Sequence, residues 1–280
     1  MQGFLLWIES IYSEREVFLI LGITYTELFR MHKWLLLSLV LFSPLIQAQE
    51  KDIEHQEQTW FAYFNQTRLT NKSWFWLDVH FRFTDDFTGQ LGQTIFRPGY
   101  IYFLTDQVRL SAGYAYVTTY SATDDTPDIP EHRPWQQVQW YDKRKHFTMM
   151  QYIRLEERFR KTLIGTELSD DYAFNYRVRY NISFTIPLKG KSVEPKTPFI
   201  FVNDEVMINF GEEIVYNYFD QNRFFAGIGY QFTKQLNAQI GYLNVFQQRA
   251  SGNQFVHVDA VRLFVFHALD FRKQKEWHSL

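Results

Sequence analysis

The 280-residue chain contains no cysteine. This absence excludes disulfides, thiolate metal sites, iron–sulfur clusters and cysteine nucleophiles. A basic excess is also lacking, since 29 Lys and Arg stand against 31 Asp and Glu, and we therefore predict no nucleic-acid partner. The longest apolar run, residues 34–46, is shorter than the about 20 residues that a transmembrane helix needs. A polytopic helical membrane protein is thus excluded as well.

Aromatic residues, in contrast, are abundant: 28 Phe, 17 Tyr and 8 Trp make up 19% of the chain. From Trp60 onward apolar and polar residues alternate, most regularly over 174–186. Successive side chains of a strand point to opposite faces, so each alternating segment has one apolar and one polar face. A β-sandwich or a lipocalin-like barrel would show the same alternation.

The length of the segments favours a membrane barrel over these two folds. They run about 10–15 residues, whereas strands average about 5–6 residues in soluble proteins and need about 9–11 to cross a bilayer. Tyr and Trp concentrate near segment ends, as in the aromatic girdles of transmembrane barrels. We predict an all-β, antiparallel transmembrane β-barrel over residues 58–272, followed by a polar C-terminal tail at 273–280.

We predict about 10–12 strands. Eleven alternating segments can be counted, whereas bacterial barrels normally have an even number of strands. These segments are 58–67, 73–84, 93–104, 107–120, 134–141, 146–159, 172–186, 198–210, 222–232, 236–248 and 255–270. In the last of them, either face suits the outside of the barrel. Gly227 and Gly229 interrupt another segment, and we expect them to make room inside the barrel for a bulky neighbour.

Residues 31–48 have the pattern of a secretory signal peptide. His32 and Lys33 precede the apolar run, and Ala48 stands at the expected cleavage site. This pattern predicts an exported chain that starts near Gln49. Residues 1–30 contain four glutamates, and we interpret them as an upstream over-extension of the gene model. The alternative is a genuine N-terminal helix before an internal anchor.

Residues 49–57 form an acidic arm in which no strand pattern is evident. Glu50, Asp52, Glu54 and Glu57 stand there against a single Lys51. Our hypothesis is that the arm lies in or across the mouth of the barrel and pairs with arginines in the lumen. The alternative is a loose tail, which is common at chain termini.

The polar faces of the predicted strands define a lumen network in which arginines outnumber acidic residues. Its predicted members are Asp78, His80, Arg82, Arg97, Arg109, Arg154, Glu156, Arg158, Arg177, Arg179, Glu205 and Arg223. Glu156 shares a face with two arginines and is placed to make charge-assisted hydrogen bonds. The network is either a ligand or ion site, or a polar plug that fills a small barrel.

Neither a catalytic site nor a metal or cofactor site is predicted. Asp78 and His80 are about 7 Å apart along a strand, which is expected to prevent a direct pair, and Ser111 lies on another strand. A G-x-S-x-G sequence does not occur. His132, His146, His257, His267 and His278 show no metal-ligand spacing.

Several short motifs carry a family resemblance over the chain from about Trp60. They include an Arg-x-Glu-x-Arg-Phe strand at 154–159, the segments 203–206 and 219–224, and glycine-containing segments at 227–230 and 241–244. With these motifs the chain resembles a domain-of-unknown-function family of predicted outer-membrane β-barrels of Bacteroidota. The resemblance implies a barrel in the outer membrane and no established activity.

We therefore predict a non-enzymatic outer-membrane barrel: a narrow anion-preferring channel, a small-ligand transporter or a structural barrel. Outer-membrane lipid and the barrel-assembly machinery are its expected partners, and the ligand is not identified by the sequence. The alternative is a membrane-embedded hydrolase that acts on lipid or lipopolysaccharide.

Overall fold

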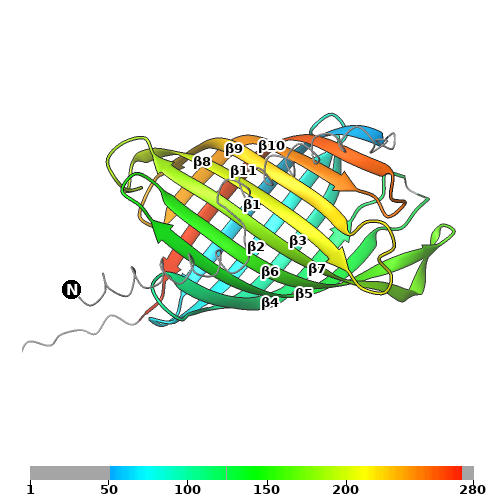
Figure 1. Cartoon of the computed structure of the whole chain (residues 1–280), viewed down its shortest axis with the longest axis horizontal. Coiled ribbons are helices and arrows are strands. Elements are labelled where there is room, and N and C mark those ends of the chain that lie inside the picture. Colours follow the sequence, from blue (N-terminus) through cyan, green and yellow to red (C-terminus); the bar gives the residue numbers. More distant parts are fainter. Residues whose placement is uncertain (1–50, 124, 273–280) are drawn as a thin grey trace, which may run out of the picture. The chain divides into compact units, whose positions relative to one another are not determined.

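Eleven strands close into a barrel in a computed structural model that describes residues 51–123 and 125–272 (Figure 1). The strands are β1 (Asp52–Arg68), β2 (Ser73–Thr84), β3 (Gln90–Phe103), β4 (Val108–Thr119), β5 (Ile129–Lys143), β6 (Thr148–Ile164), β7 (Glu167–Pro187), β8 (Thr197–Phe210), β9 (Phe219–Gln231), β10 (Leu236–Gln248) and β11 (Gln254–Asp270). The predicted all-β barrel is confirmed, and its strand number falls within the predicted range. The described part of the chain has no helix that is long and apolar enough to cross a membrane. The predictions for 1–48 and 273–280 lie outside the described residues.

The odd strand number is accommodated by one parallel contact. β1 runs parallel to β11, from Asp52 opposite Gln254 to Arg68 opposite Asp270, and all other neighbouring strands are antiparallel. The described chain therefore begins at one rim of the barrel and ends at the other. We call the rim where β1 begins the N-rim and the rim where β11 ends the C-rim.

The predicted acidic arm is wrong for residues 52–57, which belong to the barrel wall. β1 begins at Asp52 rather than at residue 58, and this early part of the strand pairs with β11. The physical reason is that β11 begins at Gln254 and its backbone groups need a partner over their whole length. Glu54 forms an ion pair with Arg249 at the N-rim, not with the arginines of the predicted lumen network.

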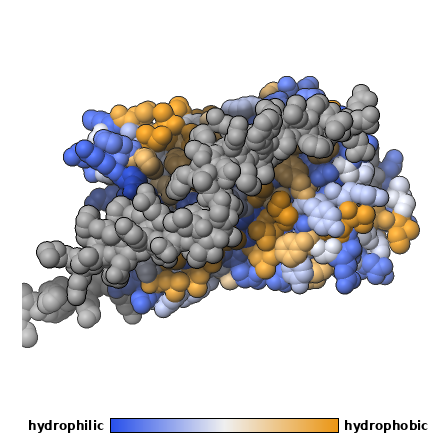
Figure 2. All heavy atoms as spheres, in the orientation of Figure 1, coloured by the Kyte–Doolittle hydropathy of each residue, from blue (hydrophilic) through white to orange (hydrophobic). Residues whose placement is uncertain are grey.

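The alternation of side chains follows the predicted faces. Apolar side chains such as Phe75, Phe96 and Ile228 point outward and are exposed. Figure 2 shows apolar side chains at several places on the visible outer face, with hydrophilic ones between them. The sequence did not decide which face of the segment 255–270 points outward. In β11, which corresponds to it, Val256 and Val258 line the lumen, whereas Val261 and Leu263 are exposed outside.

The interior of the barrel holds two apolar clusters. One lies on β1 and β9 to β11 and comprises Trp60, Ala62, Phe225, Leu243, Val245, Val256, Val258, Ala260 and Phe264. The other lies on β2 to β5 and comprises Trp76, Ile95, Ile101, Ala115, Val117 and Trp135. The expected role of the glycines is confirmed at Gly229, because the ring of Phe199 occupies the space that a Cβ would need. Polar side chains fill the remaining inward positions and form the candidate site.

Candidate functional site

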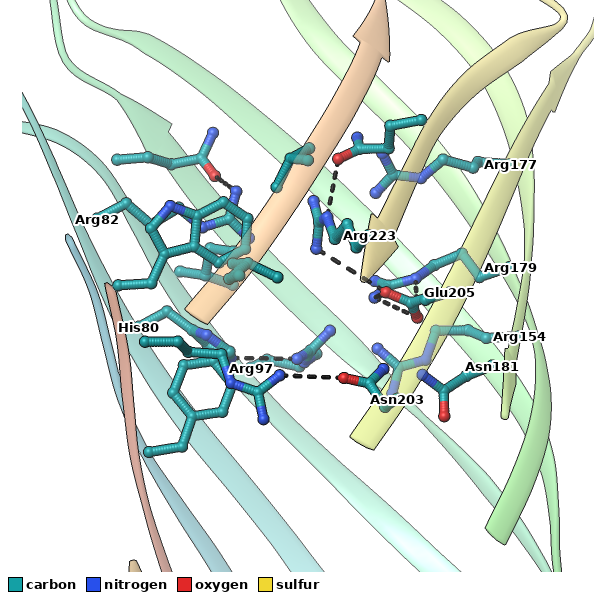
Figure 3. A pocket seen from close by; sticks show the side chains of 18 of the residues that line it. His80, Arg82, Arg97, Arg154, Arg177, Arg179, Asn181, Asn203, Glu205 and Arg223 are labelled. Carbon is teal, nitrogen blue, oxygen red and sulfur yellow. Dashed lines mark hydrogen bonds and ion pairs between the residues drawn. The ribbon is translucent and has the colours of Figure 1, made fainter. Parts of the chain in front are cut away.

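A cavity of about 1100 Å³ extends along the lumen (Figure 3). Its lining includes Lys234 and Gln235 in the β9–β10 turn at the C-rim. It also includes Arg249 and Ala250 in the β10–β11 turn at the N-rim. The cavity therefore reaches from one rim to the other, past the polar network in the middle of the barrel.

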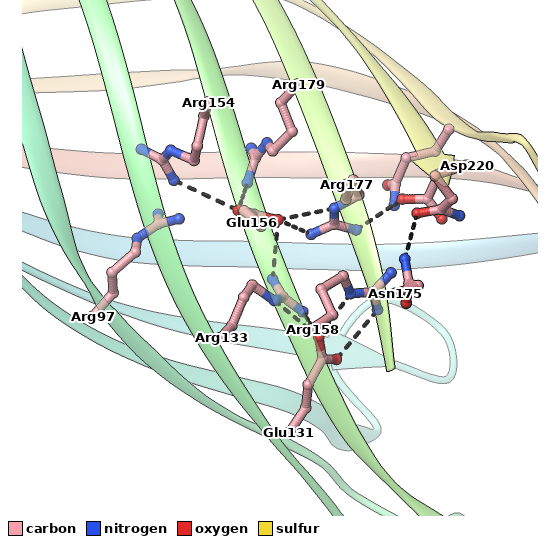
Figure 4. Close-up of polar contacts among 12 residues, drawn as sticks. Arg97, Glu131, Arg133, Arg154, Glu156, Arg158, Asn175, Arg177, Arg179 and Asp220 are labelled. Atoms are coloured by element: carbon pink, nitrogen blue, oxygen red, sulfur yellow. Dashed lines mark hydrogen bonds and ion pairs between the residues drawn. The ribbon is translucent and has the colours of Figure 1, made fainter. Parts of the chain in front are cut away.

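Glu156 on β6 is the centre of this network (Figure 4). Its carboxylate is fully buried and accepts hydrogen bonds from Arg177, at 2.5 Å from Nη2, and from Arg179, at 2.8 Å from Nη1. The guanidinium groups of Arg154 and Arg133 lie at 3.8 and 4.0 Å. Four guanidinium groups thus surround a single carboxylate. They stabilise its negative charge, and one carboxylate cannot neutralise all four of them.

Arg179 connects this centre to a second carboxylate on β8. Its Nη2 donates to Glu205 at 2.7 and 2.8 Å, while its Nη1 bonds Glu156. Tyr152 donates its hydroxyl to Glu205, and Arg223 on β9 lies 3.9 Å away from the same carboxylate. The two acids are therefore held apart by one guanidinium group, which charge-assisted hydrogen bonds fix in position.

A second group of the network is built on Asp78 of β2. Asp78 accepts hydrogen bonds from Trp76 Nε1 at 2.5 Å and from Arg97 Nε at 2.9 Å. His80 also contacts it directly, with 2.8 Å between Nε2 and Oδ1, so the prediction that these two residues would not pair is wrong. Both side chains lie on the inner face of β2. The histidine side chain is long enough for its ring to reach the carboxylate two residues earlier in the strand. Arg97 Nη2 lies 3.2 Å from the same histidine nitrogen.

Two acidic residues and two arginines of the network escaped the sequence analysis. Glu131 accepts hydrogen bonds from Arg158, at 2.7 Å from Nε, and pairs with Arg133 at 2.9 Å. Asp220 accepts from Arg177 Nη1 at 2.7 Å. The register of β8 and β9 shifts between Met207 and Ile208, so Asp220 is an extra residue in a bulge and turns inward out of alternation.

The other missed residues are Arg133 and Arg262. Arg133 and Glu131 precede the predicted start of their strand, because Pro130 and Pro134 argue against a strand. Glu131 and Arg133 stand at positions two apart, but the residues around them, His132, Pro134 and Gln136, give no apolar alternation that would have indicated a strand. Arg262 lies on β11, whose inward face the alternation alone did not decide.

Comparison with known proteins identifies the family. The model of the family described as "Protein of unknown function (DUF2490)" matches residues 57–256. The chain belongs to the DUF2490 family. An uncharacterised protein of Methylorubrum extorquens is 29% identical over 185 residues, which cover 63% of this chain and 73% of that protein. No solved structure matches.

The DUF2490 match extends from β1 into β11, and so it includes nearly the whole barrel wall. The predicted resemblance to a family of unknown function is thereby confirmed. The Bacteroidota origin and the outer-membrane location that it implied stay predictions.

Most of the predicted network residues lie on the cavity of this DUF2490 barrel. Those in its lining are His80, Arg82, Arg97, Arg154, Arg158, Arg177, Arg179, Glu205 and Arg223. Asp78 and Glu156 are completely buried and bonded to these arginines. Arg109 stands apart, with its guanidinium group 4.5 Å from the ring centre of Tyr141 and a 3.4 Å hydrogen bond to Gln66.

Three arginines of the DUF2490 lumen keep buried nitrogen atoms without a hydrogen-bond partner among the described residues: Arg82 Nε, Arg154 Nη1 and Arg262 Nε. Arg82 lies over the ring of Trp60 at 3.7 Å, and Arg223 approaches the same ring at 4.9 Å. Within the described part of the chain, neither Arg82 nor Arg262 has a carboxylate within 4.0 Å. Arg82 and Arg262 thus line the cavity without an acidic partner among the described residues.

Proposed function

We propose that this protein is an outer-membrane β-barrel whose lumen selects and passes small organic anions. The observation that carries this proposal is the excess of arginine around a cavity that reaches both rims. Arg82, Arg223 and Arg262 contribute guanidinium groups that the acidic residues do not fully neutralise. Like charges in a confined, weakly screened space repel each other, and an anion between them removes this repulsion.

Guanidinium chemistry supports carboxylates or phosphates as the preferred anions. The group is planar and presents paired N–H donors that match two oxygens of such an anion. Arg82 and Arg262 line the cavity with guanidinium groups of this kind. We therefore expect oxyanions to interact with the lumen more strongly than chloride does.

The apolar wall of the cavity supports an organic anion over an inorganic one. Leu243, Val245 and Val258 line the cavity next to Trp60, within reach of the same space as the arginines. A cavity of about 1100 Å³ is large enough for a small organic molecule. A short carboxylate with an apolar tail would place its charge on the arginines and its tail on this wall.

The outer face of the barrel supports a membrane location. Large apolar side chains are exposed along it, among them Phe96 at 51% and Ile228 at 61%, and Tyr100 and Tyr242 at 48% each. Such a surface is unfavourable in water and suited to lipid. Membrane fractionation tests the location, together with the faster migration of unheated samples in SDS gels that closed barrels show.

The alternative of a membrane-embedded hydrolase is less well supported by the geometry. The Asp78–His80 pair could assist a nucleophile, but Nε2 of the histidine is engaged by both Asp78 and Arg97. The buried hydroxyl of Ser111 has no hydrogen-bond partner among the described residues, His80 included. The pair is thus arranged as part of the arginine network.

The decisive experiment measures the reversal potential of the refolded protein in a planar bilayer under a potassium chloride gradient, and then with acetate and octanoate as the anions. We expect anion selectivity, and a chloride current that micromolar to millimolar octanoate reduces. The double substitution Arg82→Gln and Arg223→Gln should lower both selectivity and octanoate block. Arg144→Gln, which removes an exposed arginine of the β5–β6 turn, is the matched control. Cation selectivity, or a folded barrel without conductance, would overturn the proposal.

A further inference from the structure

Two histidines meet on the outer face of the seam that closes the barrel. His55 of β1 lies directly opposite His257 of β11, in the parallel register of these strands. Their Nδ1 atoms are 3.2 Å apart, and their rings are 5.0 Å apart with an interplanar angle of 78°. This angle excludes stacking, so the contact is one between two nitrogen atoms and not between ring faces.

Asp259 completes a cluster with these histidines. It follows His257 by two residues on β11 and therefore lies on the same outer face. A histidine nitrogen from each ring and a carboxylate oxygen of Asp259 all lie within 4.8 Å of one another. Tyr242 on β10 donates its hydroxyl to Oδ1 of Asp259.

Asn244 on β10 orients His257 from the other side. Its side-chain amide lies 2.5 Å from Nε2 of the histidine. The atom at this position is Nδ2, which also lies 3.2 Å from the hydroxyl of Tyr242. A metal on Nδ1 of His257 requires a proton on Nε2, and the amide would then turn its oxygen to accept from Nε2–H. The lone pair of His257 then lies on Nδ1, which is the atom that faces His55. Partners that hold the second nitrogen of a ligating histidine in this way are typical of metal sites.

The geometry agrees with that of a tetrahedral zinc site. Zinc–nitrogen bonds of about 2.0–2.1 Å place two nitrogen ligands about 3.3–3.4 Å apart. The Nδ1 atoms of His55 and His257 are already 3.2 Å apart. The carboxylate of Asp259, within 4.8 Å of these nitrogens, would move in to the third position, and water would occupy the fourth. We infer that His55, His257 and Asp259 bind a zinc ion at the outer face of the seam between β1 and β11.

A zinc ion at this place would stabilise the weakest edge of the barrel. β2 pairs with β1 only from Thr59 onward. Residues 52–58 therefore have a strand neighbour on one side only, which is β11. This part of β1 is thus an edge segment held by a parallel ladder, which is slightly less stable than an antiparallel one. Two ligands from β11 and one from β1 would connect the first and the last strand by bonds stronger than those of the ladder.

The inference is independent of the lumen, because all three ligands face outward. The expectation of no metal-ligand spacing concerned His257 and other histidines of the sequence, and it did not include His55. His55 and His257 are far apart in the sequence and meet only through the closure of the barrel. The alternative is that the two rings share a hydrogen bond and bind no metal.

Zinc titration of the full chain, purified without a polyhistidine tag and treated with EDTA, tests the inference. We expect saturable binding of one zinc ion, measured by calorimetry, and an unfolding temperature that rises with zinc concentration. Cobalt should give the visible absorption of a tetrahedral site, a readout that a purely structural contact would not produce. His55→Gln and Asp259→Asn should weaken binding by more than about 10-fold, and Asn244→Ala by about 10–100-fold.

His132→Gln is the matched control. His132 is a histidine on β5 whose ring lies near Tyr114 and Tyr172, and the described residues place no other histidine or acid beside it for a metal. This variant should bind zinc as the natural chain does. If the natural chain shows no saturable zinc binding, or if the His55 and Asp259 variants bind zinc equally well, the inference is overturned.

Discussion

The two sides of the lumen follow the same alternation of side chains but present opposite chemistry. On β5 to β8 the inward positions hold the carboxylates and guanidinium groups around Glu156, whereas on β10, β11 and β1 they hold aliphatic residues such as Leu243 and Val258. The charged side is constrained by directional bonds, and the apolar side by contact area alone. The difference shows that alternation decides which residues share a face, but not whether the inner face is polar.

The largest effect is expected on the charged side, from Glu156→Gln. The substitution removes the negative charge from a carboxylate that accepts hydrogen bonds from two buried arginines. Breaking a buried ion pair from one side costs about 3–5 kcal/mol, because the remaining charge is left uncompensated. Urea unfolding of the refolded barrel measures this free energy, and the reversal potential should shift toward stronger anion selectivity.

The matched control for Glu156 is Glu194→Gln, a substitution in the exposed β7–β8 connection, with an expected change within about 0.5 kcal/mol. If both variants have the same stability, the network around Glu156 does not hold the charged side together.

On the apolar side, Leu243→Ala should lower the free energy of unfolding by about 2–5 kcal/mol. Leu243 is almost fully buried among Trp60 and Val245, and truncation leaves a void on the cavity wall. The reversal potential should stay unchanged, because the side chain carries no charge. A change of selectivity in this variant would mean that the two sides of the lumen do not act separately.

A smaller loss of stability is expected where β9 approaches β8. In Gly229→Ala, the added methyl group would overlap with the ring of Phe199, and overpacking of this kind costs about 1–3 kcal/mol. The double substitution with Phe199→Leu opens space and should recover part of the loss, which a double-mutant cycle measures. Additive effects of the two substitutions would show that the ring and the glycine do not depend on each other.

The smallest effect is expected at the N-rim, outside both sides of the lumen. The Glu54–Arg249 ion pair is about half exposed, at 51% and 46% of the side chains. Glu54→Gln should therefore change the free energy of unfolding by about 1 kcal/mol or less, and the difference should vanish in high salt. If the loss of unfolding free energy in Glu54→Gln were larger at high salt, Glu54 would stabilise the early part of β1 by something other than this ion pair.

Much of the network was predictable because it lies on regular strands. Arg154 and Glu156 alternate with the apolar Ile153 and Leu155, and Arg177 and Arg179 with Tyr176, Val178 and Tyr180, so period two places each set on one face. Asp220 was not predictable in this way, since it turns inward through a bulge whose position depends on the pairing of β8 with β9. The Asp78–His80 pair depends on side-chain conformation, which strand spacing does not determine.

Long strands with two distinct faces follow from the amino-acid sequence, because hydrophobic periodicity is a local property of neighbouring residues. The abundance of arginine on the polar face follows from it as well. The closure of the barrel, in contrast, is visible only in the folded chain. The parallel pairing of β1 with β11 depends on residues about 200 positions apart, and it alone draws residues 52–57 into the wall, orients β11 and brings His55 to His257. Such contacts are set by the satisfaction of backbone hydrogen bonds around the whole ring, and no local pattern in the sequence encodes them.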